Sequence, residues 1–191
     1  MQRPNAKKRQ KITVAAARLF ATRPFHEVRL DDLAAAAHVG KGTLYIYFRS
    51  KEDLYCSLIH DGMARVIEQI KQVVASDFPP PEAVEKVVAR LVRFAFGHPY
   101  LYELLRAIDP VKHHESLAQL RRQLTSSIEQ VFRRGAERRI WRDPHPDLTA
   151  VFIPGLVRSA VLYGPKELGE KAVTDQILRL LRHGLLKENS R

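Results

Sequence analysis

Apolar residues recur along this chain at intervals of three and four, a spacing that places them on one face of an α-helix. The pattern runs through most of the 191 residues, and the strand-like alternation of apolar and polar positions is almost absent. The periodic segments predict nine helices, at about residues 6–21, 30–37, 41–49, 51–75, 83–96, 100–107, 111–138, 147–163 and 171–186. The chain is therefore predicted to be all-α.

The fourth predicted helix, residues 51–75, has clear signals at both ends. Ser50 and Asp53 have the spacing of a capping box, in which each side chain accepts a hydrogen bond from the other residue's amide. Phe78-Pro-Pro-Pro81 follows the helix and ends it, because proline has no amide hydrogen and restricts the residue before it. At 1.5 Å per residue this helix spans about 37 Å, long enough to join two bodies. We expect two domains, residues 1–50 and residues 51–191.

The positive charge of the chain is concentrated at its N-terminal end. Lysine and arginine number 32 against 21 aspartate and glutamate, a net charge of +11. Residues 1–51 hold eleven basic and three acidic side chains, a net of +8. A basic end on a nearly balanced body is typical of a protein that binds a polyanion, although a solvated surface can carry the same charge. The first basic residues, Arg3, Lys7, Lys8 and Lys11, either contact DNA or form a solvated tail.

Residues 30–48 have the spacing of a helix-turn-helix, with a short turn at Ala37-His-Val-Gly40 between two short helices. In the second of these helices, Leu44 and Phe48 share the side expected to face the core. The outward side and its flanks carry uncharged residues: Gly42, Thr43, Tyr45, Ile46 and Tyr47. In a DNA major groove, Ile46 would contact a thymine methyl group and the tyrosine hydroxyls would reach phosphates. The alternative is that both tyrosines pack against neighbouring helices of an unrelated bundle.

The run Leu30-Asp-Asp-Leu-Ala-Ala-Ala-Ala-His-Val-Gly-Lys-Gly-Thr-Leu-Tyr-Ile-Tyr-Phe48, followed by Ser50-Lys-Glu-Asp-Leu54, resembles the DNA-binding domain of the TetR/AcrR transcriptional regulators. The resemblance covers about the first quarter of the chain, and Gly42-Thr-Leu-Tyr-x-Tyr-Phe48 is specific to that family. It implies that Lys41, Thr43, Tyr45, Tyr47 and Lys51 contact DNA. Together with the outward face and one more basic residue, the candidate DNA-contacting set is Arg29, Lys41, Gly42, Thr43, Tyr45, Ile46, Tyr47 and Lys51.

Two positions depart from the pattern of that family. His38 stands where the family usually has a glycine, so we expect a left-handed backbone there, at a cost of about 1 kcal/mol. Arg23-Pro-Phe25 replaces a loop that contains glycine. Asp31 and Asp32, in the first turn of the second helix, are expected to interact with the helix dipole rather than with DNA.

The resemblance further implies a homodimeric regulator that binds a palindromic operator in double-stranded DNA and is released by a small-molecule inducer. A repressor is favoured over an activator, because the family usually acts by blocking a promoter. We expect the dimer to form through the last two helices, where Gly155 and Ser159 leave one side small. The candidate ligand-binding residues are Met63, Ile67, Phe94, Tyr100, Tyr102, Leu105, Leu124, Ile128 and Phe152, although core packing is the commoner role for such residues.

The sequence indicates no catalytic site, no metal site and no cofactor. Cys56 is the only cysteine, the eight histidines lack metal-ligand spacing, and glycine-rich phosphate loops and nucleophile elbows are absent. No apolar run approaches the length of a membrane helix and no secretory signal is recognisable, so a cytoplasmic protein is expected. The alternatives are a DNA-binding protein without a small-molecule pocket, either architectural or controlled by a partner, and, more remotely, an enzyme.

Overall fold

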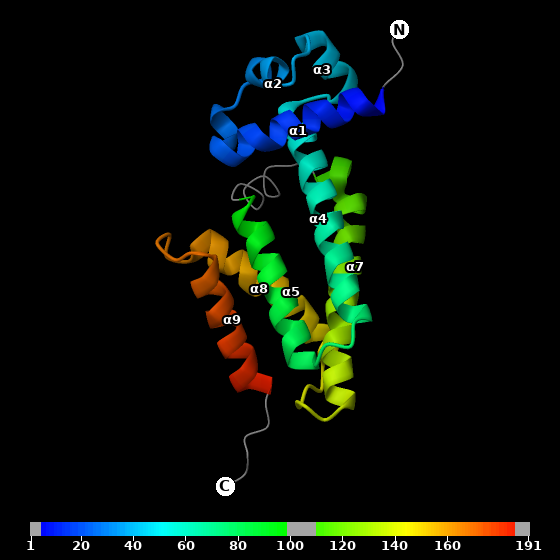
Figure 1. Ribbon diagram of the computed structural model, residues 1–191, viewed down its shortest axis with the longest axis vertical. Helices are drawn as coiled ribbons and strands as arrows, with labels where there is room; N and C mark the ends of the chain where they lie inside the picture. The colour runs from blue at the N-terminus through cyan, green and yellow to red at the C-terminus, as the bar shows by residue number, and fades with distance from the viewer. Residues whose placement is uncertain (1–4, 99–109, 186–191) are drawn as a thin grey trace. The chain divides into compact units, whose positions relative to one another are not determined.

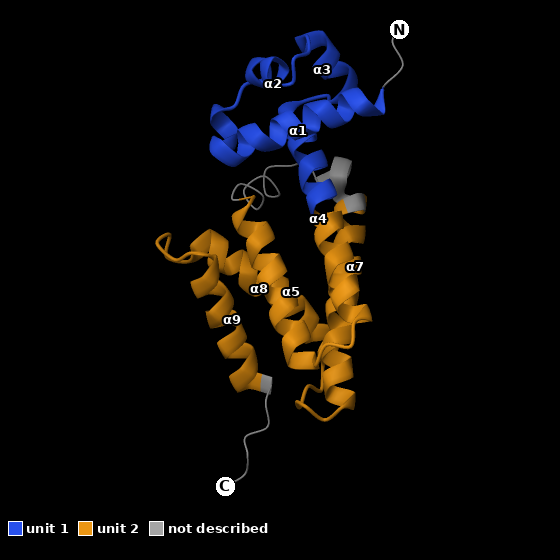
Figure 2. Cartoon of the chain, viewed as in Figure 1, with its two compact units in different colours: residues 1–62, 103–108 blue, residues 63–102, 109–191 orange. Residues whose placement is uncertain are grey.

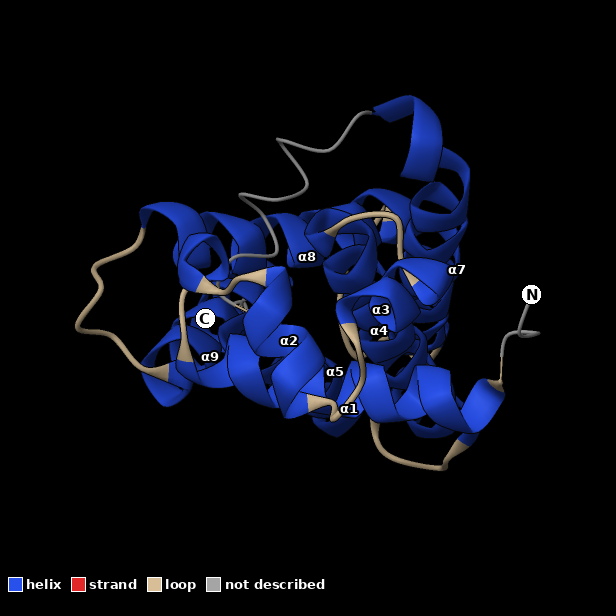
Figure 3. Ribbon diagram, turned by 90° about the horizontal axis from the view of Figure 1, so that it is seen from above, coloured by secondary structure: helices blue, strands red, loops and turns tan. Residues whose placement is uncertain are grey.

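The computed structural model describes residues 5–98 and 110–185, and the regular structure of these residues is helical throughout (Figures 1 and 3). The eight α-helices of this part are α1 (Ala6–Thr22), α2 (Leu30–Ala36), α3 (Lys41–Tyr47), α4 (Lys51–Ala75), α5 (Pro80–Phe96), α7 (Pro110–Glu137), α8 (Pro146–Tyr163) and α9 (Glu170–Leu185). A 3-10 turn, η1 (Phe25–Glu27), joins α1 to α2. The predicted all-α fold is confirmed. The helix predicted at residues 100–107 lies outside the described residues.

The predicted helix boundaries differ from the observed ones chiefly where proline is present. α5 begins at Pro80, three residues before the predicted start, and α8 begins at Pro146 instead of residue 147. Proline suits the first turn of a helix, because its fixed φ is helical and the missing amide hydrogen has no acceptor there. The prolines that follow α4 therefore also start α5, which the sequence-based boundary did not include.

The chain divides into two compact units (Figure 2). Among the described residues, the first unit extends to Gly62 and contains α1, α2, α3 and the start of α4. The second unit contains the rest of α4 from Met63 onward, together with α5, α7, α8 and α9. A single helix, α4, is thus shared by both units. The predicted domain boundary, between residues 50 and 51, coincides with the start of this helix and stays a prediction.

The core of the first unit is formed by the apolar side of α1, packed against α2, α3 and the start of α4. Ile12, Ala16 and Phe20 recur every four residues on α1, and all three are buried. The ring of Phe20 meets the ring of Tyr55 edge to face, with 4.8 Å between the centroids. The ring of Phe25 stacks on Phe20 at 5.6 Å. This aromatic cluster closes the end of the unit where α1 passes into α2.

In the second unit, the C-terminal end of α4 is held by a side chain of α7. The Arg134 guanidinium donates to the carbonyl oxygens of Val74 and Ser76, both at 3.1 Å, and to that of Phe78 at 3.3 Å. The last carbonyl groups of a helix have no partner within it, so they need donors from elsewhere. Ser76 supplies a further donor, because its hydroxyl bonds the carbonyl oxygen of Gln72. Arg134 therefore fixes the end of α4 and the start of the segment that leads to α5.

Close by, Trp141 folds back onto the last turn of α7. Its indole nitrogen donates to the carbonyl oxygen of Phe132 at 2.9 Å, and its ring lies against Gly135. A Cβ atom on Gly135 would lie 2.0 Å from a ring carbon of Trp141. Glycine is required at this position because of the close approach, since the backbone φ of this residue is not positive.

Gly135→Ala is expected to destabilise the protein, because the new methyl group must displace the buried Trp141 ring. Overpacking of this kind costs about 1–3 kcal/mol, which exceeds the roughly 1 kcal/mol that alanine gains over glycine in a helix. Urea unfolding should therefore show a lower midpoint at an unchanged slope. Gly42→Ala is the matched control, because nothing lies within 4 Å of the added Cβ; a similar midpoint shift in both variants would contradict the packing argument.

Candidate nucleic-acid interface

The turn between α2 and α3 is closed by two backbone hydrogen bonds of 3.0 Å, from His38 N to Ala35 O and from Val39 N to Ala34 O. This pair of bonds is the Schellman motif, which needs a left-handed residue just after the helix. His38 occupies that position with φ 49°. The left-handed backbone expected at His38 is confirmed, and it sets the direction in which α3 leaves the turn.

The rotation of α3 about its own axis is set by two buried side chains. Leu44 and Phe48 are 0% and 2% exposed, while Tyr45 and Ile46 are 49% and 51% exposed. At Gly42, an added Cβ would meet nothing within 4 Å. The predicted assignment of core and outward sides is confirmed, and the outward side of α3 is uncharged and open.

At the start of α3, Lys41 forms an ion pair with Asp31 of α2. The Lys41 Nζ atom lies 2.9 Å from Asp31 Oδ1, and both side chains are well exposed. The hydrogen bond to Asp31 raises the pKa of Lys41, which stays charged. Asp31, expected only to interact with the helix dipole, therefore also holds one of the candidate DNA-contacting residues.

Two other candidates are engaged by neighbouring segments of the first unit. Lys51, the first residue of α4, donates to the carbonyl oxygen of Phe25 at 2.8 Å, and its ammonium lies 4.3 Å from the centre of the Phe25 ring. The hydroxyl of Tyr47 accepts a hydrogen bond from the backbone amide of Asn5 at 2.9 Å. Both side chains are partly buried, and these contacts hold them close to the junction where α3 ends and α4 begins.

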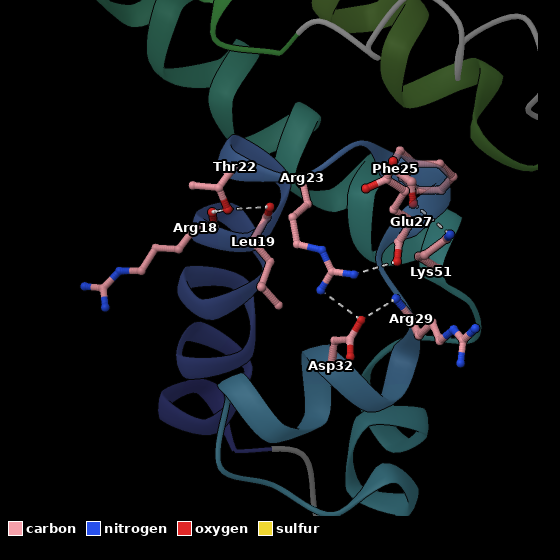
Figure 4. A network of polar contacts seen from close by, with 9 residues as sticks. All are labelled: Arg18, Leu19, Thr22, Arg23, Phe25, Glu27, Arg29, Asp32 and Lys51. Carbon is pink, nitrogen blue, oxygen red and sulfur yellow. Dashed lines mark hydrogen bonds and ion pairs between the residues drawn. The ribbon is translucent and has the colours of Figure 1, made fainter.

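The loop between α1 and α2 is stabilised by a network around Asp32 (Figure 4). Arg23 donates to Asp32 Oδ2 at 3.1 Å and to the carbonyl oxygen of Glu27 at 2.9 Å. The amide of Arg29 also donates to Asp32 Oδ2, at 3.0 Å. The pKa of Asp32 is lowered, chiefly by the bond from the Arg29 amide. Arg23 thus holds the loop that differs from the glycine-containing loop of the similar family, while the guanidinium of Arg29 points away from the network (Figure 4).

The predicted capping box at the start of α4 is present in altered form. The Asp53 amide donates to Ser50 Oγ at 3.1 Å, as expected. The Asp53 carboxylate, however, accepts from the amide of Arg49 at 2.9 Å instead of that of Ser50. Both bonds bring the chain directly from the end of α3 into α4.

The candidate ligand-binding residues that the structure describes occupy different places in the second unit. Ile67, Phe94, Leu124 and Ile128 are buried, and Met63 is partly exposed. Phe152 lies on the surface, 54% exposed. Tyr100, Tyr102 and Leu105 lie outside the described residues. The ligand-binding role of this set stays a prediction.

Among residues 5–98 and 110–185, no group of three histidine, cysteine, aspartate or glutamate side chains is placed to hold a metal ion. Cys56 is buried, and burial with the nearby charges of Asp53 and Glu52 raises the pKa of its thiol to about 11. The thiol is therefore protonated at neutral pH and a poor nucleophile. No helix in this part of the chain is both long and apolar enough to cross a membrane.

Comparison with known proteins relates this architecture to bacterial regulators. Residues 12–58 match the family model described as "Bacterial regulatory proteins, tetR family". The fatty acid metabolism regulator protein of Bacillus subtilis (strain 168) is 29% identical over 83 residues, which are 44% of this chain and 43% of that protein. The chain thus spans less than half of the length of this curated relative.

Two solved structures share the fold over nearly their whole length. A transcriptional regulator of the TetR/AcrR family from Thermobifida fusca superimposes with a TM-score of 0.79 at 22% identity, over 97% of this chain and 100% of that chain. The regulator FadR from Bacillus subtilis, in complex with stearoyl-CoA, has a TM-score of 0.72 at 18% identity, over 90% and 96%. The likeness of fold therefore includes the second unit, where the family model has no match.

His38→Gly is expected to stabilise the fold, because a left-handed backbone costs a residue with a Cβ about 1–2 kcal/mol. The greater freedom of glycine in the unfolded chain offsets about 0.5–1 kcal/mol of this, so a net gain of about 0.5–1 kcal/mol remains. Thermal unfolding should show a rise of about 2–4 °C per kcal/mol gained. His38→Ala keeps the Cβ atom and should give no gain in stability. An equal rise of the unfolding temperature in both variants would show that loss of the imidazole ring, and not loss of the Cβ atom, causes the stabilisation.

Proposed function

We propose that the chain is a transcriptional regulator of the TetR/AcrR family and binds a specific DNA sequence through α3, because residues 12–58 match the tetR family model and the fold is shared with a regulator of that family. The observation that carries the proposal is the burial of Leu44 and Phe48, which turns an uncharged, open face of α3 outward. A helix of this kind reads base edges in the major groove, where its N-terminal residues come closest. The family consists of regulators rather than enzymes. We infer that the protein binds DNA in the cytoplasm.

The proposed contacts divide into those that read bases and those that position the protein. Ile46 contacts a thymine methyl group, and the missing side chain at Gly42 lets the backbone approach the bases. Tyr47, the last residue of α3, and Lys51, the first residue of α4, face the phosphates and carry no sequence information. Lys41 exchanges its exposed partner Asp31 for a phosphate, at little cost because exposed ion pairs contribute at most about 1 kcal/mol.

A homodimer is supported by an apolar stripe on α8. Leu148, Val151, Phe152 and Tyr163 are between 46% and 71% exposed, and they recur at helical spacing along one side. An added Cβ at Gly155, on the same side, would meet nothing within 4 Å. Contiguous exposed apolar surface of this kind marks an interface. We infer that two copies pair through α8 and α9, which provides one recognition helix for each half of a palindromic operator.

The apolar residues of α9 divide into two groups. Val173 and Ile177 are buried inside the unit, whereas Leu180 is 51% exposed. The proposed interface therefore consists of the α8 stripe and Leu180, while Val173 and Ile177 support it from within. Close approach of two α8 helices at Gly155 suits the packing of a four-helix bundle.

We further propose that the protein is a repressor, released from its operator by a small molecule with a long acyl chain. The similar FadR structure holds stearoyl-CoA, and the curated relative regulates fatty acid metabolism. Ile67, Leu124 and Ile128 supply the apolar surroundings that such a chain needs. All three lie on α4 or α7. A ligand bound among them therefore acts on α4, which carries Lys51 at its N-terminal end.

The proposed function is tested by selecting duplexes from a random library with the wild-type protein. We expect a two-fold symmetric sequence, bound by two chains and released by stearoyl-CoA. Ile46→Ala should relax the preference at one base pair in each half-site by about 1 kcal/mol, because alanine is too short to touch the thymine methyl group. Lys51→Gln is the contrasting variant. It should weaken binding to all sequences alike, and the slope of log affinity against log salt concentration should decrease by about 0.9 for each phosphate that is no longer neutralised.

Four outcomes would contradict parts of this proposal. Failure to enrich any sequence would contradict sequence-specific DNA binding itself. Unchanged base preference in Ile46→Ala would remove the thymine contact, and an effect of Lys51→Gln confined to the operator would make that residue a base reader. A complex insensitive to stearoyl-CoA would favour a DNA-binding protein controlled by a partner or not controlled by ligands.

Phe152→Glu is expected to dissociate the dimer, because it places an unpaired charge at the centre of the proposed interface. Sedimentation velocity should show a monomer, and operator affinity should fall at least about 100-fold, since two linked half-site contacts become independent. Leu168→Glu is the matched control, because Leu168 is similarly exposed but lies outside α8. If both variants stay dimeric, the interface lies elsewhere.

A further inference from the structure

A second, basic surface of the first unit lies on α1, and the residues that line it include none of α3. It is a groove of about 760 Å³ between α1 and the end of α2. One wall is α1, and the other is the last turn of α2 with the turn that follows it. The lining residues that the argument uses are Lys7, Lys11, Val14, Arg18 and His38.

The charge of this groove is not neutralised within the described part of the unit. Lys7, Lys11 and Arg18 lie on one stripe of α1, at intervals of four and seven residues. The described residues that line the groove include no aspartate or glutamate. None of the three cationic head groups is paired with a described residue, whereas Lys41, Lys51 and Arg23 all have internal partners.

The opposite wall contains the strained residue of the unit. His38 holds a left-handed backbone that glycine would adopt more easily, and its side chain is exposed in the groove. Strain of this kind is concentrated at functional positions. His38 also lies only three residues before Lys41, where α3 begins. One end of the groove therefore adjoins the helix that we propose to enter the major groove.

We propose that this groove binds the phosphate backbone of duplex DNA that flanks the half-site read by α3. The inference rests on the proposed function and extends the DNA-binding surface to α1. Lys7 and Arg18 are about 16 Å apart along the helix axis, a length equal to about five base pairs at 3.4 Å each. The three cations contact phosphates along this length, the His38 ring donates a hydrogen bond, and Val14 packs against sugar.

Such contacts add affinity without adding sequence preference, because phosphates are the same at every position. They complement α3, whose outward face carries no charge. An acidic segment of another protein has the same charge complementarity. DNA is favoured because the groove belongs to the unit that carries α3 and ends beside it.

The test compares wild type with Lys7→Gln/Lys11→Gln/Arg18→Gln on two duplexes, by fluorescence anisotropy over a range of KCl concentrations. One duplex is the selected operator trimmed to its two half-sites, and the other adds ten base pairs at each end. The triple variant should bind the trimmed duplex like wild type. On the extended duplex its affinity should fall about tenfold or more, and the salt slope should decrease by about 0.9 for each phosphate that is no longer neutralised.

Arg121→Gln/Arg138→Gln/Arg142→Gln is the matched control, because it removes the same net charge from exposed residues of the second unit. An equal fall in affinity in the two triple variants would show a general effect of charge and overturn the proposal. His38→Gly separates binding from folding, because it should raise the unfolding temperature yet weaken binding to the extended duplex.

The outcomes also separate this inference from the proposed function. A wild-type protein that selects no sequence contradicts the proposed function. If wild type selects an operator but the α1 variant binds both duplexes normally, only the groove proposal fails. In that case the groove is free for an acidic protein partner instead.

Discussion

The burial of Leu44 and Phe48 is the constraint on which the candidate interface depends. α3 has only seven residues, and it is anchored by the buried side chains of Leu44 within the helix and of Phe48 directly after it. Once both are buried against the first unit, Gly42, Tyr45 and Ile46 must face outward. Replacing either anchor with a polar residue would turn the face as well as weaken the core. Stability of the unit and the identity of the exposed surface therefore depend on the same two residues.

The helix α4 carries a comparable constraint, since its two ends are fixed in different units. At the first end, Lys51 donates to the carbonyl oxygen of Phe25, and Asp53 accepts a hydrogen bond from the amide of Arg49. At the second end, Arg134 of α7 bonds to three carbonyl groups. A ligand that alters the packing of α7 on α4 thus acts on a helix without a free end. In the proposed function, this continuity connects the interior of the second unit to the residue that contacts phosphate.

Most of the helices could be predicted from the sequence, because each apolar side repeats at helical spacing. The two sides of α3 followed from the same rule, and the backbone of His38 followed from comparison with a glycine in the family. The partners of Arg134 could not be predicted, because they are carbonyl groups about 60 positions away, and every residue has one. The contact of Trp141 with Gly135 and the pairing of Lys41 with Asp31 also depend on how helices meet. Apolar periodicity predicts each helix separately and does not predict the contacts that form where two helices pack together.

The distribution of charge in the first unit separates two tasks that a DNA-binding surface must perform. Base edges are distinguished by hydrogen bonds and apolar contacts of limited strength. A free cation on the reading face would bind every sequence through the phosphates and reduce the difference between right and wrong sites. The outward face of α3 is uncharged, and Lys41 and Lys51 beside it are held by Asp31 and the Phe25 carbonyl. The cations of the α1 groove have no such partner among the described residues. Under the two proposals, their attraction to DNA increases affinity while the selection of sequence is left to α3.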